Sequence, residues 1–143
     1  MKYSYLPSTE IKVSKICLGT MTFGNQNSEH EAFEQMDYAL DKGVNFFDTA
    51  ELYPVPATPQ LYADTEKIIG KWMKERKNRD QIVLATKIAG PGDYTKRIRT
   101  TGFSKNSIID KHKLGLLIFQ HPIKFWFLVT IFSLFIQSTL PRF

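Results

Sequence analysis

Three short apolar segments alternate with two amphipathic ones in the first two thirds of the chain, and this alternation limits the possible folds more than any other feature. The apolar segments are residues 16–18, 44–49 and 81–87, and the amphipathic ones are residues 28–43 and 62–77. Short unbroken apolar strands that alternate with helices are typical of a parallel sheet with helices packed outside it. The pattern therefore predicts an α/β protein, either an open doubly wound sheet or part of a (β/α)₈ barrel.

Local signals define the ends of these elements. Ser28 and Glu31 have the spacing of a capping box, and Gly43 stands where a glycine would end the helix. Residues 3–14 form two alternating runs around a Pro-Ser-Thr turn, which predicts a leading hairpin. Ser104 is a candidate cap for a third helix.

Polar residues collect where the predicted strands end, and this favours the barrel over the open sheet. Gly19 and Thr20 follow the first strand, Asp48 ends the second, and Lys87 ends the third. Barrel enzymes carry their chemistry at this rim. Neither a G-x-G-x-x-G fingerprint nor a Walker A sequence is present to support a nucleotide-binding open sheet. We therefore predict the N-terminal portion of a (β/α)₈ TIM barrel, about three βα units plus the hairpin. The barrel is expected to be incomplete, because a typical one takes about 250 residues.

Asp48, Tyr53 and Lys87 together suit proton transfer. A free tyrosine has a pKa of about 10 and is a poor acid at neutral pH. A nearby ammonium stabilises the phenolate, and a carboxylate beside the lysine keeps the lysine charged and in place. Such a tyrosine could protonate the oxygen of a carbonyl group while hydride reaches its carbon.

The residues around this site resemble the aldo/keto reductase family, and within it the Tas-like branch. The similar stretches are "LGTMTFG" (18–24), "GVNFFDTAELYP" (43–54), "YADTEKIIGKW" (62–72) and "IVLATKIAGP" (82–91). The resemblance covers about residues 1–110. It implies reduction of small-molecule aldehydes or ketones by NADPH, or sometimes NADH, on a (β/α)₈ barrel without a metal.

The same resemblance assigns roles to individual residues. It implies that Tyr53 is the general acid and that Asp48 and Lys87 are its catalytic partners. It also implies that Gly19, Thr20, Met21 and Asp48 line the nicotinamide end of the cofactor.

The resemblance ends near Asp110. The family's fourth catalytic residue is a histidine after strand four, but only fifteen positions separate Asn106 from His121. A helix, a turn and a strand need more chain than that, so His121 is not expected to take this role. We expect residues 1–110 to be a partial reductase barrel and residues 111–143 to be an unrelated apolar tail. The simplest interpretation is a truncated or frame-shifted reductase that is inactive alone.

Two alternatives remain at the level of sequence. The uncharged run 125–140 reaches only about 24 Å as a helix, against ~30 Å for the hydrocarbon core. Residues 114–140 are long enough to span this core, although they include Lys124, so the first alternative is a membrane-associated fragment anchored by the tail. The chain could instead dock as a partial subunit on an intact reductase.

The composition bears on the cellular compartment of the protein and on its binding partners. Cys17 is the single cysteine, so no internal disulfide can form, and a reduced cytoplasmic compartment is the default expectation. The N-terminus lacks the apolar region of a signal peptide. Residues 71–113 carry twelve Lys/Arg against four Asp/Glu. No aromatic residues are interleaved with these charges in a nucleic-acid-binding pattern, so we expect a solvated face and no nucleic-acid partner.

Overall fold

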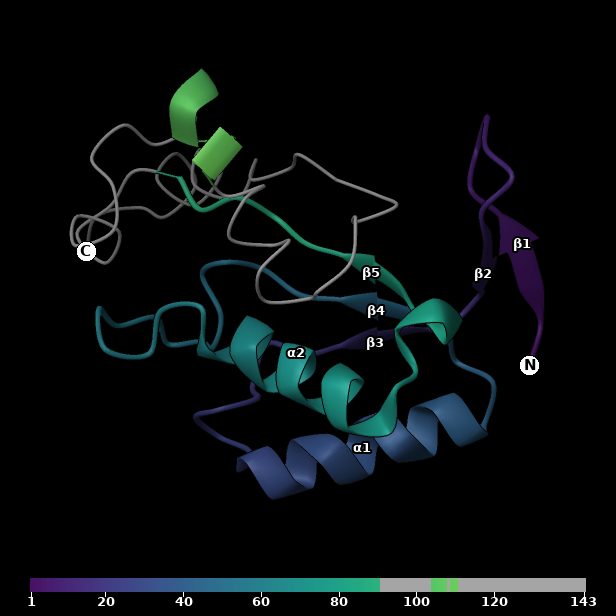
Figure 1. The fold of residues 1–143 in the computed structure, drawn as a ribbon, viewed down its shortest axis with the longest axis horizontal. Helices are drawn as coiled ribbons and strands as arrows, with labels where there is room; N and C mark the ends of the chain where they lie inside the picture. The colour runs from purple at the N-terminus through teal and green to yellow at the C-terminus, as the bar shows by residue number, and fades with distance from the viewer. Residues whose placement is uncertain (91–103, 108, 111–143) are drawn as a thin grey trace, which may run out of the picture.

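The computed structural model of the protein describes residues 1–90, 104–107, 109 and 110 (Figure 1). In these residues a β-hairpin precedes a sheet whose strands alternate with helices, as predicted. The elements are β1 (Tyr3–Tyr5), β2 (Lys12–Ser14), β3 (Cys17–Gly19), α1 (Glu29–Asp41), β4 (Phe46–Asp48), α2 (Asp64–Arg76), the 3₁₀ turn η1 (Arg79–Gln81) and β5 (Val83–Ala85).

The three strands after the hairpin form one parallel sheet in the order β3-β4-β5. Gly19 pairs with Asp48, and Asp48 pairs with Ala85, so all three strands end at the same level. The predicted parallel arrangement is therefore confirmed. The three-residue strands β4 and β5 are shorter than their apolar segments in the sequence, whereas β3 has the length of its segment and lies one position later.

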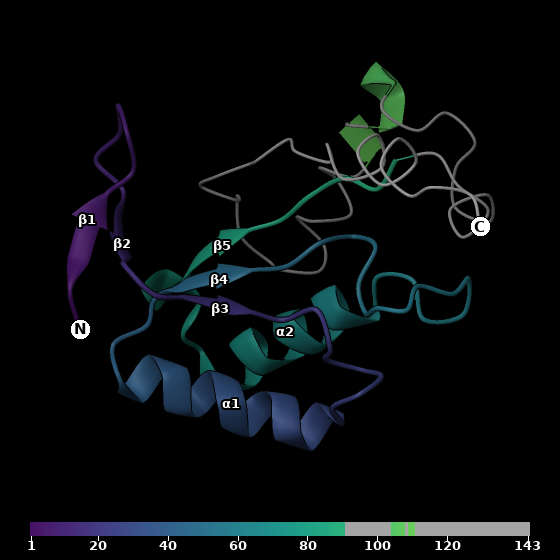
Figure 2. The same ribbon diagram turned by 180° about the vertical axis from the view of Figure 1, so that it is seen from behind.

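The hairpin lies at the opposite end of the sheet from these strand ends (Figures 1 and 2). Its strands pair antiparallel, from Tyr3 opposite Ser14 to Tyr5 opposite Lys12. Asn45 fixes it to the sheet, because its side chain accepts from Ser14 N at 2.7 Å and donates to Lys12 O at 3.1 Å. The hairpin thus closes the floor of the sheet and leaves the other end open for a site.

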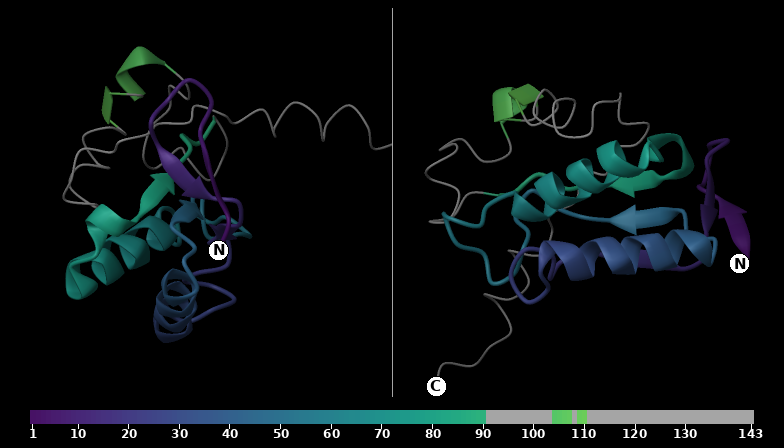
Figure 3. Two further views of the ribbon diagram at one scale, coloured as in Figure 1. Left: turned by 90° about the vertical axis from the view of Figure 1, so that its right-hand side faces the viewer. Right: turned by 60° about the horizontal axis from the view of Figure 1, so that its bottom comes forward.

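Both helices pack on one face of the sheet (Figure 3). The core between them includes Phe47, Trp72 and Leu84, all at most 2% exposed. The rings of Phe47 and Trp72 stack with centroids 5.7 Å apart. Strand residues alternate between faces, so Phe46 and Val83 point to the other face, where they are only half-buried. In a barrel, that second face is the interior.

The predicted helix ends are confirmed in α1. Ser28 Oγ accepts from Glu31 N, and the carboxylate of Glu31 accepts from Ser28 N at 2.7 Å, which completes the capping box. Gly43 follows the helix with φ +80°, a left-handed conformation that glycine adopts without strain.

The predicted third helix begins as expected. Residues 105–107, 109 and 110 are helical, and Ser104 Oγ accepts from Ser107 N at 3.2 Å. The predictions for His121 and for residues 114–140 lie outside the described residues, as does the whole of the predicted tail, 111–143. Within the described part of the chain, no helix has the length and apolar character needed to cross a bilayer.

Candidate active site

The carboxyl ends of the three parallel strands form the rim on which the predicted residues meet. Gly19 ends β3, Asp48 ends β4, and Lys87 lies two residues beyond β5. Thr20 fixes the first strand end to the second, because its backbone N–H and its hydroxyl both donate to Asp48 O, at 3.1 and 2.9 Å. Thr49 N donates in turn to Ala85 O at 2.9 Å. The backbone at this rim is therefore held on both sides of Asp48.

Lys87 and Asp48 form a close ion pair at the centre of the rim. Lys87 Nζ donates to both carboxylate oxygens of Asp48, at 2.7 and 2.6 Å, and to Thr49 O at 2.7 Å. The side chain of Lys87 is 23% exposed and that of Asp48 is 39% exposed. An ammonium has three hydrogens, and these three acceptors account for all of them. The charge of Lys87 is thus fixed in one position.

Tyr53 lies against this fixed charge. Lys87 Nζ is 5.1 Å from the centroid of the Tyr53 ring, over its face. A turn positions Tyr53, since its backbone N–H donates to Ala50 O at 3.0 Å. The structure therefore brings Asp48, Tyr53 and Lys87 together as the sequence predicted. The lysine acts on the ring through space, while its hydrogens bind Asp48 and Thr49.

The residues predicted to line the nicotinamide differ in how accessible they are. Nothing among the described residues lies within 4 Å of a Cβ built on Gly19, so the rim is open there. Met21 is 45% exposed, and its carbonyl accepts from Val55 N at 3.0 Å. Thr20 is fully buried. Gly19, Met21 and the half-buried Asp48 therefore present a surface, whereas Thr20 supports Asp48 from behind.

Two residues near the rim were not singled out from the sequence. Cys17 lies two positions before Gly19 and so shares its face of β3. Cys17 as a whole is exposed, but partial desolvation of its thiol and the negative charge of Asp48, opposed by Lys87, together raise the pKa of the thiol to about 11. Strand alternation alone would have placed Cys17 here. The second residue is Glu51, which is fully buried and lies between Asp48 and Tyr53 in the sequence.

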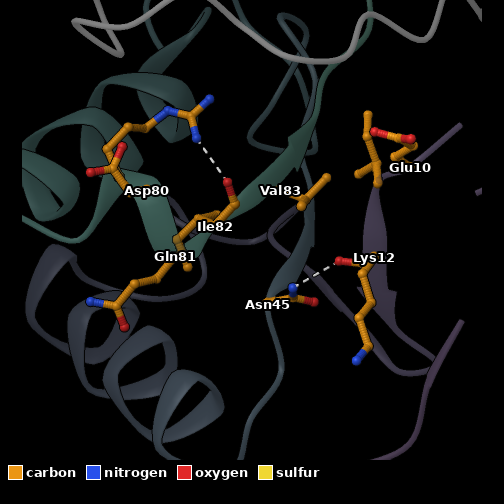
Figure 4. Close-up of a pocket in the computed structure, with 9 residues that line it drawn as sticks. Glu10, Lys12, Asn45, Asp80, Gln81, Ile82 and Val83 are labelled. Atoms are coloured by element: carbon orange, nitrogen blue, oxygen red, sulfur yellow. Dashed lines mark hydrogen bonds between the residues drawn. The ribbon is translucent and has the colours of Figure 1, made fainter. Parts of the chain in front are cut away.

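Two cavities lie elsewhere in the fold. One of about 270 Å³ lies between the hairpin and the start of β5, where its lining includes Glu10, Lys12, Asn45 and Arg79 (Figure 4). Another of about 430 Å³ lies beside the first turns of α1 and α2. Neither is lined by a predicted site residue. The part of the chain that the structure describes contains no group of three or more His, Cys, Asp or Glu arranged to hold a metal ion.

Comparison with known proteins identifies the family. The family model described as the aldo/keto reductase family matches residues 15–121. The protein tas of Escherichia coli is 44% identical over 91 residues, which cover 64% of this chain and 26% of that protein. The uncharacterized oxidoreductase YrpG of Bacillus subtilis is 48% identical over 92 residues, covering 64% of this chain and 27% of that protein.

Solved structures give the same result. An aldo-keto reductase from Bacillus halodurans in its holo form has a TM-score of 0.68 and 30% identity, and the match covers 90% of this chain and 40% of that one. A putative aldo-keto reductase from Pseudomonas aeruginosa, with a TM-score of 0.71 and 22% identity, shows the same fold. This chain spans about a quarter of the length of its curated relatives. It belongs to the aldo/keto reductase family, and its fold is the predicted N-terminal portion of a (β/α)₈ barrel.

Proposed function

We propose that the rim is the proton-donating site of an NADPH-dependent reductase of small-molecule aldehydes or ketones, with Tyr53 as the general acid. The observation that carries this proposal is the fixed ammonium of Lys87, bound by Asp48 and lying 5.1 Å from the centre of the Tyr53 ring. A cation in a fixed position costs no reorganisation when charge develops beside it.

Each residue has a separate task in this proposal. The Tyr53 hydroxyl donates its proton to the carbonyl oxygen as negative charge develops there. Lys87 stabilises the phenolate that remains, and Asp48 keeps Lys87 oriented. The reduced nicotinamide, when bound, supplies the hydride.

The open side of the rim fits a flat ring. Gly19 has no side chain and has free space above it, and the exposed side chain of Met21 follows two positions later in the chain. The absence of a Cβ at Gly19 leaves room for a ligand to approach the backbone beside Asp48. We propose that Gly19, Met21 and Asp48 contact the nicotinamide, and that Thr20 acts by holding Asp48 in place.

The chain alone is proposed to have little or no reductase activity. Three parallel strands cannot close a barrel, and β3 and β5 are the outer strands of the sheet in the described residues. Reduction needs acid, hydride donor and carbonyl together in reacting geometry. The described residues supply the acid and one part of a cofactor site. Titration of the chain with NADPH, followed by tryptophan fluorescence, measures whether the chain binds the cofactor. Binding at micromolar NADPH would contradict the proposal that the chain alone is inactive.

A chimera with a complete barrel tests the site even though the described residues supply only one part of the cofactor site. Residues 1–90 replace the matching N-terminal part of the E. coli protein tas, which is 44% identical to this chain over 91 residues. Reduction of an aromatic aldehyde by NADPH is followed by absorbance at about 340 nm. The matched variant is Tyr53→Phe, which removes only the hydroxyl. Because general acid catalysis typically contributes 10²–10⁴-fold, we expect kcat to fall by at least about 100-fold, with cofactor affinity unchanged.

The outcome is decided by comparison of these two chimeras. An active chimera whose Tyr53→Phe variant keeps more than a third of its kcat would refute the role of Tyr53. A chimera that folds and binds NADPH but reduces no aldehyde or ketone would refute the proposed reaction.

A further inference from the structure

Glu51 is an ionisable residue in the interior of the fold, and it lies between Asp48 and Tyr53 in the sequence. Its side chain is fully buried, and Oε2 accepts from Ala89 N at 2.9 Å. Removing a carboxylate from water is costly unless hydrogen bonds replace its hydration. An apolar residue of similar size would avoid that cost, so packing alone does not account for glutamate at this position.

The hydrogen bonds of Glu51 extend the β4–β5 ladder beyond the strand ends. In a parallel ladder, one residue donates through its N–H and accepts through its C=O from positions two apart on its neighbour. Glu51 N donates to Lys87 O at 3.0 Å, so its C=O would be expected to accept from Ala89 N. Instead, Glu51 O accepts from Ala63 N at 3.1 Å, and the carboxylate takes Ala89 N. The side chain thus substitutes for a backbone acceptor.

This substitution lets one residue bind two segments at once. The backbone carbonyl is released to the start of α2, while the side chain and the N–H both hold the segment 87–89. Lys87 therefore makes one of the two bonds to Glu51, Ala89 makes the other, and Tyr53 follows Glu51 by two residues. The separation of Lys87 Nζ from the Tyr53 ring depends on how these two segments are held together.

We propose that Glu51 is a positioning residue, which fixes the loop carrying Tyr53 against the segment carrying Lys87 by accepting from Ala89 N. Its importance for reduction rests on the proposed function, but its effect on geometry can be measured without cofactor or substrate. A carboxylate makes a stronger bond to an N–H than a neutral amide oxygen does. Glutamine keeps the acceptor and the volume, whereas methionine keeps only the approximate volume.

The test reads the position of Tyr53 relative to Lys87 by NMR of the full chain with ¹³C-labelled tyrosine. Tyr53→Phe assigns the Tyr53 resonance. The displacement of that resonance by Lys87→Met is then measured with Glu51 intact, with Glu51→Gln and with Glu51→Met. We expect Glu51→Gln to keep at least half of the displacement and Glu51→Met to lose at least four fifths of it. Hydrogen exchange at Ala89 N should become at least tenfold faster in Glu51→Met.

Glu66 provides the matched control for loss of a buried carboxylate. It is also fully buried, and it accepts from the hydroxyl of Thr86 from its position on α2. Glu66→Met, the counterpart of Glu51→Met, should leave both the displacement and the exchange at Ala89 within a factor of two of the unmodified chain. A general loosening of the core would change these readouts in both variants, whereas the proposed role changes them only at Glu51.

Three results would overturn the proposal. The first is a folded Glu51→Met chain that keeps the full displacement. The second is exchange at Ala89 that is unchanged in that variant. The third is a Glu51→Gln chain that does not fold, since this would assign the carboxylate to folding and not to positioning. If Glu51→Met does not fold, the Glu51→Gln chain decides through its displacement and its Ala89 exchange. A chimera without activity would refute the proposed function and leave these geometric results unaffected.

Discussion

Replacing Lys87 with methionine and Asp48 with asparagine, singly and together, measures how strongly the candidate site is held. The ammonium lies 2.6–2.7 Å from both carboxylate oxygens, and the side chains are 23% and 39% exposed. Exposed ion pairs contribute about 0.2–1 kcal/mol, whereas breaking a fully buried pair costs about 3–5 kcal/mol. This pair is partly buried, so we expect a coupling energy of about 1.5 kcal/mol between these limits.

Urea unfolding of the four proteins gives this coupling energy as a double-mutant cycle. Fluorescence is read in a Trp126→Phe background so that the signal comes from Trp72 in the core. At 1 M salt the screening length is about 3 Å, comparable to the separation of the paired atoms. Partly buried pairs are screened much less than exposed ones, so we expect more than half of the coupling to survive between 0.1 and 1 M salt.

The pair formed by Lys42 and Asp41 serves as the control. Its side chains are 56% and 70% exposed, although its atoms are also 2.6 Å apart. Its coupling should be much smaller and should disappear in 1 M salt. A coupling between Lys87 and Asp48 below about 0.3 kcal/mol, the usual error of additivity, would refute the conclusion that Asp48 fixes the lysine.

Four further predictions concern the fold and the rim. Ser28→Ala should lower the free energy of unfolding by about 1 kcal/mol in urea, and Ser28→Asn should largely preserve it. Hydrogen bonds from Ser28 lower the pKa of Glu31 in the folded protein. The stability that ionised Glu31 adds should therefore be complete above the ordinary pKa of 4.5 and be lost as the pH falls through the lower pKa of the folded state. Glu31→Gln should accordingly be destabilising at pH 7 but not at strongly acidic pH. Trp72→Ala should cost about 3–5 kcal/mol, enough to abolish cooperative thermal unfolding followed by circular dichroism. Because the pKa of Cys17 is raised to about 11 by burial and by Asp48, its reaction with a disulfide reagent at pH 8 should be about tenfold slower than that of a free peptide thiol, and equal rates would refute this.

The elements of the fold could be predicted because their signals are local. The capping pair of Ser28 and Glu31, the glycine after α1 and the apolar strands each act over a few residues. The parallel sheet followed from their order, since strands joined through helices are usually parallel. The lengths of β4 and β5 were overestimated, because their predicted segments continue beyond the last paired residue at each end.

The candidate site was predictable as a set of residues but not as an arrangement. Strand alternation and a common rim were enough to bring Asp48 and Lys87 together. That Lys87 gives its hydrogens to Asp48 and Thr49, and meets Tyr53 across the ring face, depends on side-chain conformations set by several elements. Glu51 was overlooked because a buried carboxylate and an exposed one look the same in a sequence. Its role becomes visible only when Ala89 is seen beside it.

A glycine can be required by the fold or by a ligand that approaches it closely, and the open space above Gly19 allows these two requirements to be told apart. No left-handed backbone is recorded there, and an added methyl group would meet no described atom. The packing of the described residues therefore does not require glycine at position 19, and we expect an intolerance of alanine to report a ligand that approaches the rim. Gly19→Ala becomes a steric reporter that leaves the scaffold's stability nearly unchanged while occupying the space where a ring would lie. Side chains of graded size at this position would measure, methyl by methyl, how closely such a ring approaches the backbone.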